Sequence, residues 1–147
     1  MAERNRKQRK NAMERLIVPA TLECLDKVTD FVEQMLSAAS FANEKKLQVR
    51  LVVEEIFVNI ASYSFPEGEG EAEIRCELLS DPQRIRITFS SGGVPFNPLD
   101  KEEADTSKEA LMAREGGLGI LLIKRMSDKV SYRFTSGKNV LTVEKNR

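Results

Sequence analysis

The segment 47–61 limits the possible folds of this chain most strongly, because apolar residues occupy nearly every side of the helix that it would form. A helix that is apolar around most of its circumference is stable only when other elements pack on several of its sides. Three polar residues, Glu55, Asn59 and Ser62, interrupt this surface at positions i, i+4 and i+7. They form one narrow stripe, and periodicity alone is as consistent with a stripe facing water as with one lining a cleft.

Glu55 and Asn59 form a pair that suits phosphoryl chemistry. A carboxylate at position 55 can act as a general base that accepts a proton from an attacking hydroxyl or water. The side-chain oxygen of Asn59 is a hard, neutral ligand of the kind that binds Mg²⁺ together with waters and phosphate oxygens. One helical turn separates the two side chains by ~6 Å between Cβ atoms, so one group can hold the metal while the other faces the reacting phosphoryl group.

A glycine-rich segment further along the chain offers a place for phosphate. Gly117, Leu118 and Gly119 open a predicted helix over residues 118–127, and Arg114 lies just before them. Glycine lets the backbone approach a ligand closely, and the free N–H groups of a helix N-terminus attract phosphate. The alternative is that these glycines only allow close helix packing. Arg114 lies within reach of a terminal phosphate in this arrangement, and a solvated arginine is the simpler alternative.

A second loop, residues 90–98, follows a predicted buried strand. Gly93 would let a flat base approach the backbone, and Phe96 would pack beneath that base. The alternative is a tight surface turn, which glycine and proline form readily.

The composition excludes several classes of site. The chain has no histidine, so it has no Ser-His-Asp triad and no His-ligated zinc. Its two cysteines, Cys24 and Cys76, are too few for a disulfide framework, and we expect reduced, buried thiols in a cytoplasmic protein. Lys and Arg together number 23, as do Asp and Glu, so no overall field attracts nucleic acid or a membrane surface. Basic residues outnumber acidic ones in a predicted N-terminal tail, 1–12, ahead of a single domain, 13–147.

The spacing of the apolar residues predicts the order of the elements. Strands are expected at 14–18, 71–79, 84–90, 129–135 and 139–144, and helices at 21–39, 43–62 and 118–127. Thr21 and Asn43 are placed to cap the first two helices. Because short turns join the later strands, we expect an α+β fold, a two-layer sandwich with a mostly antiparallel sheet and helices on one face.

Three segments, taken in order, resemble the motifs of the Bergerat (GHKL) ATP-binding fold. Residues 55–59 resemble its N-box, Glu-x-x-x-Asn, and residues 91–98 resemble its G1 box, Asp-x-Gly-x-Pro-Phe-x-Pro. Residues 117–120 resemble its G2 box, Gly-x-Gly-hydrophobic. The likeness runs from about residue 15 to residue 145. Within this HATPase_c-like fold, the chain is most similar to the small single-domain branch, the bacterial anti-sigma-factor serine/threonine kinases.

This resemblance implies an ATP- and Mg²⁺-dependent protein kinase that regulates transcription by partner switching. Glu55 would be the base that activates the acceptor serine hydroxyl, and Asn59 would hold Mg²⁺ on the ATP phosphates. The other nucleotide contacts would come from the two glycine loops and from the ATP lid, residues 100–115: Ser91, Gly93, Pro95, Phe96, Arg114, Gly117, Leu118 and Gly119. Family members commonly dimerise, sequester a sigma factor and phosphorylate a small antagonist protein on serine.

The chain departs from the G1 box at Ser91, where the family has an Asp that accepts a hydrogen bond from the adenine amino group. A hydroxyl is neutral and shorter, and losing a charge-assisted contact weakens binding by about 1–3 kcal/mol, or roughly 5- to 150-fold. ATP binding would then be weak, altered in base preference or lost. A second departure is Tyr63, which stands where the family often has a His, four residues after Asn59.

Ser91 leaves a second function open: a degenerate, non-catalytic member of the fold that sequesters a protein partner without nucleotide. A third is the ATP-binding part of a split sensor kinase. Because the chain has no histidine, a partner would then have to supply the phosphoacceptor.

Overall fold

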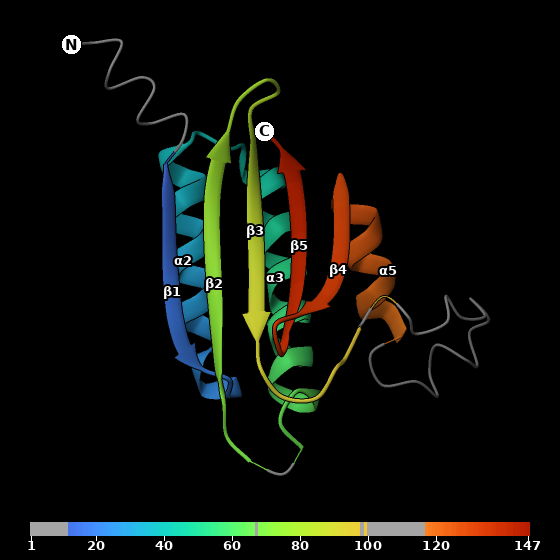
Figure 1. Ribbon diagram of the computed structural model, residues 1–147. Helices are drawn as coiled ribbons and strands as arrows, with labels where there is room; N and C mark the ends of the chain where they lie inside the picture. The colour runs from blue at the N-terminus through green and yellow to red at the C-terminus, as the bar shows by residue number, and fades with distance from the viewer. Residues whose placement is uncertain (1–11, 67, 98, 100–116) are drawn as a thin grey trace.

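The described part of the chain forms two layers, a sheet and a set of helices that cover one of its faces (Figure 1). In the computed structural model, residues 12–66, 68–97, 99 and 117–147 are described. Their strands are β1 (Met13–Pro19), β2 (Glu71–Leu79), β3 (Arg84–Ser91), β4 (Lys129–Thr135) and β5 (Lys138–Asn146). The sheet order is β1-β2-β3-β5-β4, and every neighbouring pair is antiparallel. The predicted α+β sandwich is therefore confirmed.

The helices of this part are the 3-10 helix η1 (Leu22–Cys24) and the α-helices α2 (Leu25–Ala38), α3 (Asn43–Tyr63) and α5 (Gly117–Met126). In Figure 1, α2 lies behind β1 and β2, α3 lies behind β3 and β5, and α5 lies beside β4. α3 contacts both α2 and α5, and its inward side chains join the core formed with the sheet. Packing on several sides is what the apolar pattern of this helix predicted.

Alternate residues of the central strands form the sheet's half of the core. Ile85, Ile87 and Phe89 of β3 are buried, and the residues between them are partly exposed. This is the alternation that a strand period of two predicts. The neighbouring strands and the helices supply further core residues, among them Ala72, Ile74, Cys76, Leu141, Val143, Val28, Val32, Leu36, Val53, Ile56 and Phe57.

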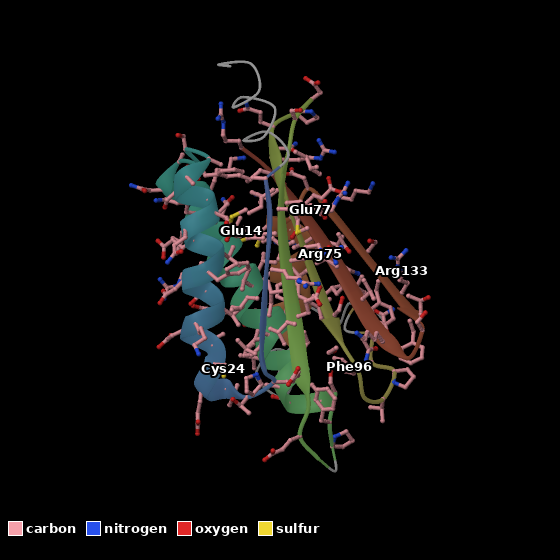
Figure 2. All side chains as sticks on the ribbon, turned by 60° about the vertical axis from the view of Figure 1, so that its left-hand side comes forward. Glu14, Cys24, Arg75, Glu77, Phe96 and Arg133 are labelled. Carbon is pink, nitrogen blue, oxygen red and sulfur yellow. The ribbon has the colours of Figure 1, made fainter. Side chains whose placement is uncertain are left out.

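Both cysteines are free, but they differ in burial. Cys76 is fully buried, and this burial, with a smaller effect from Glu14, raises the pKa of its thiol to about 12. At neutral pH its thiol is therefore protonated and unreactive. Cys24, which Figure 2 shows at the start of α2, is only half-buried, so the expectation of two buried thiols was wrong for this residue.

The first two helices begin differently from the prediction. Thr21 lies just before η1, and its hydroxyl contacts Sγ of Cys24 at 3.5 Å instead of capping a backbone N–H. Asn43 is already the first residue of α3, because Ala42 before it has the extended backbone of a cap residue (φ −64°, ψ 151°). Neither side chain caps its helix, so both cap predictions were wrong.

The sheet face that the helices leave uncovered is charged. Figure 2 shows Arg75 and Glu77 of β2 and Arg133 of β4 there. One of the two edge strands, β1, adds two exposed apolar side chains, Met13 and Ile17.

A partly buried ion-pair cluster on the same face joins β3 to β5. Glu144 lies between Arg84 and Arg86, with N–O distances of 2.7 and 3.3 Å. Burial alone would raise the pKa of Glu144, but the hydrogen bonds and charges of the two arginines outweigh it, so the pKa is lowered. The cluster supports the register of β3 against β5, and this register places Ser91 opposite Asn139.

Candidate functional site

Glu55 and Gly119 meet where α3 packs against the first turn of α5. A Cβ atom added at Gly119 would lie 2.3 Å from Oε2 of Glu55 and 3.0 Å from its Cδ. Position 119 therefore has no space for a side chain while the Glu55 carboxylate keeps its place. The two predicted site segments, far apart in the sequence, are in contact, and the carboxylate lies beside the N-terminal turn of a helix, where a negative charge is stabilised.

Asn59 lies one turn further along α3, on the wall of a pocket. Its side chain is buried, with 8% of its surface exposed. Within the described residues, neither this amide nor the Glu55 carboxylate has a hydrogen bond or ion pair to the protein. A buried amide normally has hydrogen-bond partners. Because the Asn59 amide has none within the described residues, its side chain is available to a ligand. Ser62, the third residue of the polar stripe, is exposed.

The pocket beside Asn59 has apolar walls and a few polar groups. Its lining residues are Ile56, Asn59, Ile60, Ser64, Phe89, Ser91, Phe96, Tyr132, Asn139 and Leu141. The cavity measures only about 20 Å³, enough for roughly one water molecule. A purine can therefore enter only if the walls separate. Apolar walls with few polar groups are typical of small-molecule sites.

The loop after β3 packs on the C-terminal end of α3 through Ser64. The backbone N–H of Val94 donates to the Ser64 carbonyl oxygen at 3.1 Å. Gly93 has a φ of +85°, and a Cβ atom there would lie 2.0 Å from that oxygen, so only glycine fits. The side chain of Ser91 is buried in the pocket wall, with its Oγ 3.4 Å from the Oγ of Ser64.

Asn139 of β5 holds the same loop from the opposite side. Its Oδ1 accepts a hydrogen bond from the backbone N–H of Phe96 at 2.8 Å and another from the Tyr132 hydroxyl. Its Nδ2 donates to the carbonyl oxygens of Val94 at 2.9 Å and Gly92 at 3.4 Å. An amide side chain has two acceptor and two donor positions, so every hydrogen-bonding position of Asn139 is occupied. We call this set of hydrogen bonds, which holds the loop in place, the Asn139 clamp.

The ring of Phe96 closes one side of the pocket. It stacks on Tyr63 with a centroid distance of 5.1 Å and an interplanar angle of 26°. Tyr63 is the residue after Ser62 on α3, and it stands where the related motif often has a His. Figure 2 shows Phe96 at the end of the sheet where the C-terminal end of α3 lies. Opening the pocket for a base would require this stack to shift.

A family model of the histidine kinase-like ATPase domain matches residues 18–145. The chain belongs to this family. The family implies binding of ATP. The resemblance noted from the three sequence motifs is thereby confirmed at the level of the family.

Relatives of this histidine kinase-like ATPase domain include two protein kinases. The chain is 28% identical over 109 residues to the serine-protein kinase RsbW of Listeria monocytogenes serovar 1/2a, covering 71% of this chain and 69% of the relative. It is 27% identical over 134 residues to the serine-protein kinase RsbW of Staphylococcus aureus strain JH9, covering 84% and 80%. A chain in the crystal structure of the SiaB-SiaC complex from Pseudomonas aeruginosa matches with a TM-score of 0.59 at 16% identity, covering 97% of this chain and 94% of that one. The structural match shows a shared fold.

The ATPase domain brings most of the predicted residues to one end of α3. Glu55 contacts Gly119, and the pocket next to them is lined by Asn59, Ser91 and Phe96. Gly117 and Leu118 belong to the first turn of α5, and Gly93 fixes the loop after β3. Pro95 is exposed and does not line the pocket. Arg114, the predicted lid 100–115 and the basic residues of the predicted tail lie outside the described residues.

Three residues of this site were missed in the sequence: Ser64, Asn139 and Tyr132. Asn139 lies two and four residues before the apolar Leu141 and Val143, so the strand period of two places all three side chains on the core face. That signal was available, because a buried amide needs partners. Ser64 lies in a predicted break and gave no signal.

The described residues contain neither a cluster of metal-binding side chains nor a helix that could cross a membrane. No group of three or more Cys, Asp or Glu side chains there is placed to hold a metal ion. The described helices are all too short or too polar to span a membrane.

Proposed function

We propose that this chain is an ATP- and Mg²⁺-dependent serine/threonine protein kinase that acts as an anti-sigma factor in partner switching. The observation that carries the proposal is the contact between Glu55 and Gly119. It brings a potential base and a phosphate-binding helix N-terminus together beside a pocket with apolar walls. The similarity to the serine-protein kinase RsbW supports serine as the acceptor.

In this proposal each residue has a separate role. The free N–H groups at the start of α5, from Gly117 to Gly119, bind the ATP phosphates, and the apolar pocket holds the base. Asn59 holds Mg²⁺, which when bound neutralises charge on the phosphate oxygens. Glu55 accepts the proton of the acceptor serine hydroxyl as it attacks. Arg114 and the lid 100–115 cover the terminal phosphate.

The partners follow from the same proposal. The chain forms a homodimer in the cytoplasm, sequesters a sigma factor and phosphorylates an antagonist protein that exchanges with it. The SiaB-SiaC complex contains another protein of this fold bound to a partner, which is compatible with partner exchange here.

Replacing Glu55 by glutamine tests the proposal. Glu55→Gln keeps the shape of the side chain but removes the base, so phosphotransfer from Mg-ATP to a candidate antagonist should fall by about 10²- to 10⁴-fold. Binding of Mg-ADP, measured by calorimetry, should change little. The matched control is Glu54→Gln, since Glu54 lies off the stripe and pairs with Arg50 at 3.1 Å. Equal phosphotransfer rates in the parent and Glu55→Gln would refute the kinase role.

One observation favours a second candidate, the binding module without catalysis. Ser91 offers no carboxylate to the base and instead lies within hydrogen-bonding distance of Ser64. A module of this kind would bind its protein partner equally well with ATP, with ADP and in the Glu55→Gln variant. Partner binding that depends on nucleotide would remove it.

A further inference from the structure

The base pocket contains a pair of buried hydroxyls where the related motif has one carboxylate. Ser64 and Ser91 are 1% and 2% exposed, and their Oγ atoms lie 3.4 Å apart. An ionised carboxylate only accepts hydrogen bonds, whereas a hydroxyl both donates one and accepts others. The hydroxyl pair therefore differs from the carboxylate of the related motif in two ways: it is uncharged, and it can donate a hydrogen bond as well as accept one.

The hydrogen bond between these two hydroxyls can run in either direction. When Ser91 donates to Ser64, the Ser91 oxygen presents lone pairs to a ligand. When Ser64 donates to Ser91, the Ser91 proton is free to be donated to a ligand. Rotation of two hydroxyl protons is enough to change the wall from an acceptor into a donor.

The backbone around the pair is anchored at both serines. Ser91 is the last residue of β3 and is paired with Asn139 of β5. The Ser64 carbonyl oxygen accepts from Val94 and is in close contact with Gly93. Both hydroxyls are therefore attached to anchored backbone, and reversal of the hydrogen bond between them needs only their protons to rotate.

The other polar groups on the pocket wall are occupied or assigned elsewhere. Among the described lining residues, Asn139 uses all its hydrogen-bonding positions on the loop, and the Tyr132 hydroxyl donates to Asn139. Asn59 is assigned to the phosphate side of the site. The Ser64–Ser91 pair is therefore the polar group of the described pocket wall that can form hydrogen bonds with the edge of a bound base.

We propose that this pocket accepts 6-amino and 6-oxo purines alike, so that the chain binds adenosine and inosine nucleotides with similar affinity. The inference rests on the proposed nucleotide site. An exocyclic amino group would donate to Ser91, and a 6-oxo group would accept from Ser91 after the pair reverses. A carboxylate at position 91 would instead repel the 6-oxo oxygen and favour adenine.

Calorimetric titration of the full chain with Mg-ADP and with Mg-IDP tests this inference, because the two ligands differ only in the purine edge. We expect the two Kd values of the parent to agree within about 10-fold, and Ser91→Asp to raise the preference for ADP beyond about 10-fold. Ser62→Asp is the matched control, since it adds the same charge at an exposed position of α3 and should leave the ratio unchanged.

The ratio of the Kd values for Mg-IDP and Mg-ADP in the parent tests the inference even if Ser91→Asp fails to fold. A preference for ADP above about 10-fold in the parent would overturn the inference and leave the proposed kinase site intact. Failure of both nucleotides to bind at millimolar concentration would overturn the inference and the proposed nucleotide site together.

Discussion

Replacing Gly119 by alanine should lower the phosphotransfer rate by at least about 10²-fold while the folded protein stays as stable as the parent or becomes more stable. The new methyl group would lie 2.3 Å from Oε2 of Glu55, and the flexible carboxylate would move to make room for it. Gly119 lies inside α5, where alanine is favoured over glycine by up to about 1 kcal/mol. Activity and stability are therefore expected to change in opposite directions, as measured by phosphotransfer assays and urea unfolding.

Two controls separate this effect from general damage. Gly68→Ala should change neither quantity, because a Cβ atom there would meet nothing within 4 Å. The double variant Gly119→Ala, Glu55→Gln should be little slower than Glu55→Gln alone, since both changes act through the same carboxylate. Full activity in Gly119→Ala would contradict the role given to the contact.

The second large effect is expected at Asn139. Replacing it by leucine removes its hydrogen bonds to the backbone of Gly92, Val94 and Phe96 and leaves those partly buried groups without this partner. We expect the free energy of unfolding to fall by about 2–4 kcal/mol and nucleotide binding to be lost with the shape of the loop. Urea unfolding followed by circular dichroism gives the first quantity, and calorimetry with Mg-ADP gives the second.

A graded series checks that the clamp is responsible. Tyr132→Phe removes one hydrogen bond to Asn139 and should lower the unfolding free energy by about 1 kcal/mol. Asn146→Leu makes the same substitution at the end of β5, away from the loop, and should stay within about 0.5 kcal/mol of the parent. An Asn139→Leu variant as stable as Asn146→Leu would show that the amide is not a clamp.

The fold followed from the sequence because its periods are clear. The alternation of Ile85, Ile87 and Phe89 predicted both the strand and its buried face. The apolar surface of residues 47–61 predicted a helix packed on several sides, which is the position of α3. Local features were predicted less well, because capping depends on backbone angles at single residues. Ala42 adopts the extended conformation of an N-cap residue, so Asn43 lies one residue after the cap position.

The site was only partly predictable for a different reason. Glu55 and Asn59 were visible because helix spacing alone puts them on one stripe. The hydrogen bonds of Asn139 to the loop after β3, and the Ser64–Ser91 pair, join residues far apart in the chain. They depend on the register of β3 against β5 and on where α3 ends. Residue patterns show which face a side chain occupies, but they do not show which distant group it meets.

The central claim is that Glu55, Asn59 and the start of α5 share one nucleotide site that uses Mg²⁺. Thermal unfolding of the full chain tests it, with Mg-ADP, with ADP plus EDTA and without nucleotide, in the parent and in Asn59→Ala. At 100 times the Kd, Mg-ADP should raise the Tm of the parent by roughly 5–10 °C. Most of this rise should disappear with EDTA or in Asn59→Ala. Identical parent curves with and without millimolar Mg-ADP would contradict the claim.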